Sequence, residues 1–341
     1  MSALAAPAHR DSVLRIDCDG TPLVGLLSEP VTAPALGAEA GNADKHGNDG
    51  KDGKDGDTGV LLIVGGPQYR VGSHRQFTLL GRALAASGVP CLRLDYRGMG
   101  DAGGDQRGFE QVDADIAAAL DAWMRERPAL KRVVLWGLCD AASAALLYVH
   151  RQRDARVAGL CLANPWVRTE ASLARTQVRH YYLERLRQPA FWRKLLSGRV
   201  GLSAVRELLG KLAQSRATSS GSATGAAAGQ PGASAGKARD GHHDKRNDTR
   251  HYTEQMADGL RAFRGPVLLV LSGDDYVAKE FLDRCRDGGA AWRGLLDRPG
   301  LRREDLPEAD HTFSTAAWRA RVEQLTAAFA RGVAAGGSPT P

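Results

Sequence analysis

The chain has 341 residues, 43% of them hydrophobic, and a formal net charge of +7 at pH 7. This apolar content excludes a wholly disordered chain, and no apolar run reaches the about 18 residues of a membrane-spanning helix. The N-terminal residues lack an apolar stretch behind a basic start, so we expect no secretory signal. The five cysteines have no C-x-x-C spacing, which argues against a disulfide framework and against a zinc site and favours a reducing cytoplasm.

Short apolar runs alternate with amphipathic segments along most of the chain. Residues 15–19 and 23–27 are expected to form an opening hairpin around Asp19-Gly20. Further strands are expected at 59–65, 89–95, 132–136, 157–163, 266–271 and 301–306, and helices at 73–87, 109–127, 140–151, 277–286 and 316–330. Ser73 is the expected cap of the first helix and Gly88 its stop. Apolar strands between helices are typical of an α/β fold with a mostly parallel sheet flanked by helices.

Two segments lack the large apolar residues that a packed core requires. Leu36 is the only such residue within 33–58, and residues 214–250 contain no Leu, Ile, Val, Met or aromatic residue. We expect both to be disordered inserts, because they cannot bury enough surface to offset the entropy of ordering. The folded domain is then expected over residues 12–331, followed by a flexible tail at 334–341.

The end of the strand at 132–136 is where we expect chemistry. The sequence Gly137-Leu138-Cys139-Asp140-Ala141 fits a strand–turn–helix nucleophile elbow, in which the residues two before and two after the apex are small. The N-terminus of the following helix favours a Cys139 thiolate. This motif alone is a weak signal, because a buried cysteine after a strand usually only packs.

Two later strand ends supply partners for Cys139. Asp274 and Asp275 follow the strand at 266–271, and His311 lies just before the closing helix. The order Cys139, Asp275, His311 is the α/β-hydrolase order of nucleophile, acid and base. The spacing leaves Asp274 open as the alternative acid.

An oxyanion hole requires two N–H donors. We expect one from Asp140 and the other from Gly66, in the loop after residues 59–65. Pro67 has no N–H, which makes Gln68 the alternative donor. The residues expected to bind substrate are Gln68, Tyr69, Leu138, Trp166, Tyr181 and Tyr182.

Four strings carry a resemblance to a known family. They are residues 64–77 (VGGPQYRVGSHRQF), 95–101 (DYRGMGD), 137–141 (GLCDA) and 310–314 (DHTFS). Together they resemble the exosortase A system-associated hydrolase 1 family over about residues 12–331, apart from the two inserts. The resemblance implies an α/β-hydrolase fold, a cytoplasmic hydrolase encoded beside exopolysaccharide and exosortase genes of Gram-negative bacteria, and Asp275 as the acid. It leaves the natural substrate open.

A helical lid is expected over residues 164–262, with 214–250 as its disordered linker. Residues 168–211 contain ten basic and three acidic residues. Such a surface would attract an anionic small-molecule substrate, an acidic acyl carrier or an anionic membrane surface, while a merely solvated face is the alternative. No nucleic-acid-binding motif is present.

Three functions fit these features. The first is hydrolysis of an ester, thioester or lactone through an acyl-Cys139 intermediate, which needs no metal or organic cofactor. The second is acyl transfer from the same intermediate to a sugar hydroxyl. The third is a non-catalytic scaffold in which Cys139 is inert. The triad order favours the first two over the third.

Overall fold

The computed structural model describes residues 9–31, 57–66, 68–168, 248 and 250–336. The chain divides into two compact units, one of Met1–Val167 with Thr249–Pro341 and one of Arg168–Asp248. Nearly all of the second unit, with the predicted lid helices and with Tyr181 and Tyr182, lies outside the described residues, as does most of the predicted insert at 33–58. The first unit contains the sheet and all three predicted triad residues.

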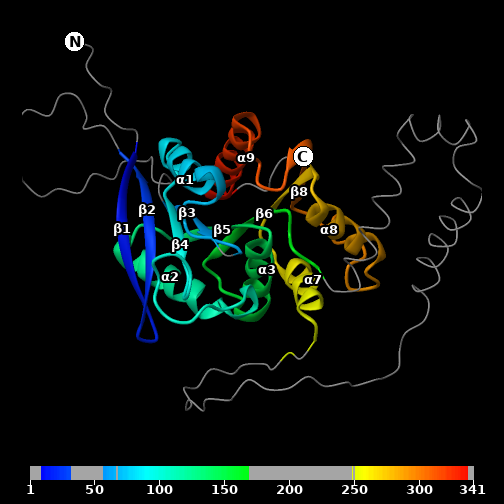
Figure 1. The fold of residues 1–341 in the computed structure, drawn as a ribbon, viewed down its shortest axis with the longest axis horizontal. Helices are drawn as coiled ribbons and strands as arrows, with labels where there is room; N and C mark the ends of the chain where they lie inside the picture. Colours follow the sequence, from blue (N-terminus) through cyan, green and yellow to red (C-terminus); the bar gives the residue numbers. More distant parts are fainter. Residues whose placement is uncertain (1–8, 32–56, 67, 169–247, 249, 337–341) are drawn as a thin grey trace, which may run out of the picture. The chain divides into compact units, whose positions relative to one another are not determined.

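A central sheet organises this unit (Figure 1), and its strand order is β1-β2-β4-β3-β5-β6-β7-β8. The strands are β1 (His9–Cys18), β2 (Thr21–Pro30), β3 (Thr58–Ile63), β4 (Cys91–Asp95), β5 (Arg132–Leu138), β6 (Val157–Ala163), β7 (Val267–Asp274) and β8 (Leu301–Asp310). β2 pairs antiparallel with β1 and β4, and the other neighbouring strands pair parallel. The predicted fold class, an α/β-hydrolase-type parallel sheet between helices, is confirmed.

Helices cover both faces of the sheet, as Figure 1 shows. The helical elements are η1 (Ser73–Arg75), α1 (Gln76–Ala86), η2 (Phe109–Gln111), α2 (Asp113–Glu126), α3 (Asp140–Gln152), α7 (Tyr252–Ala262), α8 (Tyr276–Asp287) and α9 (Ala316–Ala334). Residues of α2, α3, α7 and α8 share one core cluster with the sheet, while α1 and α9 share another. None of the helices in the described ranges is long and apolar enough to cross a bilayer.

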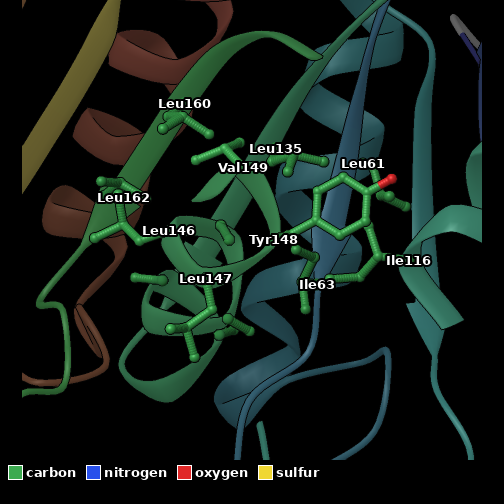
Figure 2. Packing of buried hydrophobic residues seen from close by; sticks show 14 of the residues in the cluster. Leu61, Ile63, Ile116, Leu135, Leu146, Leu147, Tyr148, Val149, Leu160 and Leu162 are labelled. Carbon is green, nitrogen blue, oxygen red and sulfur yellow. The ribbon is translucent and has the colours of Figure 1, made fainter. Parts of the chain in front are cut away.

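The two clusters follow from the alternation of side chains along each strand. In β3, Leu61 and Ile63 belong to the first cluster, and Val60 and Leu62 to the second. Figure 2 shows the first cluster, in which Tyr148 of α3 lies against β3. Because both faces of β3 are buried, its sequence is continuously apolar, which is why it was recognisable as a strand.

The hairpin prediction is confirmed, and two boundaries need correction. Asp19 (φ 52°) and Gly20 (φ 79°) both have positive φ, which a tight two-residue hairpin turn between twisted strands requires.

The predicted cap of the first helix is wrong, since α1 begins at Gln76 and its N-cap is Arg75, without a side-chain cap bond. The end of the predicted insert at 58 is also wrong, because Thr58 is buried and begins β3.

Helix α7 lies in the range predicted for the lid, but it belongs to the first unit. A Cβ on Gly259 would lie 2.3 Å from the carbonyl oxygen of Leu146, so α7 packs closely on α3. Tyr252, Met256 and Leu260 are buried at four-residue spacing, and this periodicity is a signal in the sequence that the lid prediction did not use. The lid range of 164–262 is therefore too long at its C-terminal end.

Candidate active site

Cys139 lies at the apex of a sharp turn between β5 and α3. Its backbone has φ 61° and ψ −124°, a conformation that costs a non-glycine residue of the order of 1–3 kcal/mol. The turn fits because its neighbours are small: a Cβ on Gly137 would lie 2.4 Å from the carbonyl carbon of Ala141. Its position is fixed by hydrogen bonds from the Cys139 amide to Ala163 O (2.9 Å) and from the Trp166 amide to Cys139 O (3.2 Å). The predicted elbow geometry is therefore present.

His311 follows β8 and pairs with one of the two candidate acids. Its Nδ1 lies 2.8 Å from Oδ2 of Asp275. Asp275 is buried and caps α8, accepting hydrogen bonds from the amides of Val277 (2.9 Å) and Ala278 (3.3 Å). Asp274, the last residue of β7, is exposed. The structure thus joins His311 to Asp275, the acid that the resemblance implies.

The environment of His311 favours the protonated imidazole. Burial lowers its pKa, but hydrogen bonds to Asp275 and Cys139 and the negative charges of both groups outweigh that effect and raise the pKa to about 10. Since Nδ1 faces Asp275, Nε2 is the ring nitrogen left for Cys139. An imidazolium beside a sulfur atom stabilises a thiolate by direct charge pairing.

The contribution of this pair to stability should depend on pH. The pKa of His311 rises from an ordinary 6.5 to about 10 on folding, so its stabilising effect is complete below about pH 6.5 and is lost as the pH rises through about 10. We expect the loss of unfolding free energy in Asp275→Asn to be largest near pH 6.5 and to shrink towards pH 10, measured by urea unfolding. In the control background His311→Gln, Asp275→Asn should lower the unfolding free energy by an amount that does not depend on pH. A loss that stays constant with pH in the wild-type background would contradict the assignment.

Two buried side chains hold the His311 loop to the sheet. Asn164, just after β6, donates from Nδ2 to Ser272 Oγ (2.9 Å) and to His311 O (3.1 Å). Ser272, in β7, donates from its amide to Asn164 Oδ1 (2.9 Å) and from Oγ to Asp310 O (2.8 Å). Neither residue was predicted from the sequence; the available signal was a polar residue at the end of each apolar strand.

Asn164 is therefore expected to be a positioning residue for His311. Asn164→Ala removes three hydrogen bonds and leaves buried polar groups unpaired, which should lower the free energy of unfolding by about 1–3 kcal/mol. We also expect kcat/KM for an activated ester to fall about 10-fold, because displacement of a reacting group is costly. Ser272→Ala, which leaves the bond from Asn164 to His311 in place, is the matched control and should have a smaller effect on both quantities. Equal kcat/KM in Asn164→Ala and the wild type would refute this role.

The predicted oxyanion donors lie together, but both loop amides are already bonded. The Gly66 amide donates to Oδ2 of Asp140 (2.8 Å), and the Gln68 amide donates to Gly66 O (2.9 Å). Burial raises the pKa of Asp140, while the hydrogen bond from Gly66 acts in the opposite direction. The side chain of Asp140 was not assigned a role from the sequence.

The other predicted substrate-binding residues differ in exposure. Tyr69 is 47% exposed, whereas Leu138 is only 4% exposed and packs in the second core cluster. The Gln68 side chain has its Oε1 buried, and Trp166 is half-buried against the first core cluster. Of these four, Tyr69 offers the most surface to a ligand, and the placement of Leu138 in the core does not favour the predicted contact.

Solved structures share this fold at low sequence identity. An esterase from Pyrococcus furiosus is 12% identical, with 95% of this chain and 89% of that chain covered and a TM-score of 0.52. Est1E from Butyrivibrio proteoclasticus, in a structure with bound ferulic acid, is 15% identical over 92% and 97% of the two chains, with a TM-score of 0.51. An alpha-beta serine hydrolase homologue from Coxiella burnetii is 12% identical over 93% and 96%, with a TM-score of 0.50.

A search among curated proteins finds no match. The sequence profile of the family described as serine aminopeptidase, S33, matches residues 59–284. That range contains the elbow and Asp275. Because the match spans more than half of the chain and the sheet has the corresponding architecture, the chain belongs to this family and is an α/β-fold hydrolase.

Proposed function

We propose that this enzyme hydrolyses esters, thioesters or lactones through Cys139 as nucleophile, with His311 as base and Asp275 as its orienting acid. The observation that carries the proposal is the elbow conformation of Cys139 beside a His311 that is itself bonded to Asp275. The structural neighbours include a protein named as an esterase, which supports an ester as the substrate class.

Acylation begins with the thiol proton on His311. The Cys139 thiolate attacks the substrate carbonyl carbon, a C–S bond forms, and the carbonyl electron pair moves onto oxygen. The Asp140 amide is the group available to stabilise that oxyanion, and the Gly66 amide can join it only when it is not bonded to the Asp140 side chain. The oxyanion then collapses, the C–O or C–S bond to the leaving group breaks, and the imidazolium of His311 protonates that group.

Deacylation repeats these steps with water. His311, now neutral, takes a proton from a water molecule, whose oxygen attacks the thioester carbonyl. Collapse of this second oxyanion breaks the C–S bond and restores the paired Cys139 and His311. Asp275 keeps the imidazole oriented throughout, because its carboxylate is fixed by the N-terminus of α8.

The nucleophile bears on the choice of substrate. In the tetrahedral intermediate formed from an amide, a thiolate leaves more easily than an unprotonated amine, so the intermediate tends to return to substrate. With an ester, thioester or lactone, the leaving group competes better with the thiolate. Cys139 therefore favours activated acyl groups over peptides, although the family is named for a serine aminopeptidase.

The test is a substrate panel combined with active-site labelling of the full chain. We expect turnover of p-nitrophenyl butyrate and of a short acyl thioester to exceed that of a matched p-nitroanilide. Iodoacetamide at limiting concentration should label Cys139 selectively, as mapped on peptides, and His311→Ala should abolish the selectivity. Labelling spread over several cysteines and unaffected by His311→Ala would mean that the elbow is structural and that the scaffold function is correct.

We further propose a cytoplasmic setting linked to exopolysaccharide and exosortase systems, with an anionic substrate, an acidic acyl carrier or an anionic membrane surface as the partner. Support comes from the four strings of the resemblance, the basic residues within 168–211 and five free cysteines. Charge reversal at Arg179, Arg185 and Arg187 should slow hydrolysis of an anionic ester relative to a neutral one. If the ratio of the two rates does not change, the proposal of an anionic substrate is ruled out.

A further inference from the structure

Neither predicted donor in the loop after β3 is free to bind an oxyanion. The Gly66 amide is bonded to Oδ2 of Asp140 at 2.8 Å. Residue 67 is proline, which has no N–H. The Gln68 amide is bonded to Gly66 O at 2.9 Å. The loop amide that faces the elbow is thus occupied by a side chain of the elbow itself.

The local structure makes room for that side chain. A Cβ on Gly65 would lie 2.1 Å from Oδ1 of Asp140 and 2.9 Å from the Ala141 amide, so only glycine leaves space for the carboxyl group. Oδ1 is buried and has no partner of ordinary hydrogen-bond geometry among the described residues. The Gly66 amide therefore holds the carboxyl group against the loop, and the amides of Ala141 and of Asp140 itself also interact favourably with its negative charge.

This placement conflicts with the chemistry expected at the elbow. In the acylation step, negative charge develops on the carbonyl oxygen of the substrate, next to the Asp140 amide. A carboxylate oxygen and an oxyanion cannot both accept from the Gly66 amide, and two negative oxygens at that distance repel each other. The carboxylate oxygen must therefore leave the Gly66 amide before the oxyanion of the tetrahedral intermediate can bind there.

We propose that the side chain of Asp140 closes the oxyanion hole at rest, and that the substrate carbonyl oxygen must displace it from the Gly66 amide. The inference rests on the proposed function, because it assumes attack by Cys139. Asp140 then acts as a specificity-determining residue: it slows acyl groups that bind only through their carbonyl and favours substrates with additional contacts that stabilise the displaced state.

The test compares two reagents that both react with Cys139 but differ in their need for the hole. An alkyl trifluoromethyl ketone adds to the thiolate, forming a C–S bond and placing the carbonyl electron pair on oxygen as an oxyanion. Iodoacetamide forms a C–S bond with loss of iodide and creates no oxyanion. The measured quantity is the ratio of the ketone rate constant to the iodoacetamide rate constant, both second-order, in each variant.

We expect Asp140→Ala to raise this ratio about 10-fold or more, since a charge-assisted hydrogen bond is lost from the resting state. Asp140→Asn is the matched control, because it keeps an acceptor oxygen for Gly66, and its ratio should rise by less. If Asp140→Ala does not fold, Asp140→Ser replaces it, since the hydroxyl is one atom too short to take the place of Oδ2.

The outcomes separate the two proposals. An unchanged or lowered ratio in Asp140→Ala, with selective labelling of Cys139 intact, overturns the closed hole and would make the carboxyl group a support of the loop. If iodoacetamide does not label Cys139 selectively in the wild-type protein, the proposed function is overturned, and the closed hole with it.

Discussion

Replacing Cys139 by alanine is expected to reduce hydrolysis of p-nitrophenyl butyrate to the background rate. In the proposed mechanism, the substitution removes the atom that forms the acyl intermediate, while the small side chain leaves the turn at φ 61° sterically accessible. In enzymes with such triads, loss of the nucleophile or the base typically costs about 10⁴-fold or more in kcat. The kcat of His311→Ala should therefore fall by a comparable factor.

The matched control is Cys285→Ala, which also removes a thiol but lies in α8, where the side chain is 9% exposed and packs in the first core cluster. Its kcat should stay near the wild-type value. Purified variants would be compared by initial rates at equal folded concentration, with circular dichroism as the check on folding. Wild-type activity in Cys139→Ala would place the reactive centre elsewhere.

The elbow was predictable because its constraints are local. A buried strand, small residues at 137 and 141 and a helix beginning at Asp140 all lie within a short stretch of sequence. That His311 would lie near Asp274 or Asp275 was predictable for a different reason: parallel strands end at one edge of the sheet, so residues that follow β5, β7 and β8 come together there. The strand ends left the two acids open, and only the resemblance favoured Asp275.

The interactions around the triad were not predictable in this way. The Gly66–Asp140 bond joins residues 74 apart in sequence, and the Asn164–His311 bond joins residues 147 apart. Neither has a repeating pattern that marks it, and each depends on the register of strands that are not neighbours in the chain. The sequence identifies the candidate triad residues, whereas the contacts around them appear only in the fold.

The turn after β4 illustrates a motif whose role is mainly structural. Asp95 is buried, forms an ion pair with Arg70 and accepts hydrogen bonds from the amides of Arg70 (2.7 Å) and Asp101 (3.2 Å). It thereby ties residues 95–101 to the loop that follows β3. These contacts explain how the DYRGMGD string, a turn without reactive groups, supports the loop that faces the elbow.

Asp115→Ala should be the most destabilising substitution in this region. Asp115 is fully buried in α2 and accepts from Nε of Arg97 (2.7 Å), from the Arg97 amide (3.2 Å) and from the Cys18 thiol (3.3 Å). Removing it leaves the guanidinium of Arg97 buried without its counter-charge, which typically costs about 3–5 kcal/mol of unfolding free energy. Urea unfolding would measure this loss.

The same helix supplies the control. Asp121 in α2 pairs with Arg156, but its side chain is 58% exposed, so Asp121→Ala should cost less than about 1 kcal/mol. Equal losses in the two variants would mean that burial of the Arg97–Asp115 pair contributes nothing. At temperatures where Asp115→Ala remains folded, its kcat should be within a few-fold of the wild type, because Asp115 supports the turn and touches no reacting group. Stability and catalysis are thus expected to separate cleanly between Asp115 and Cys139.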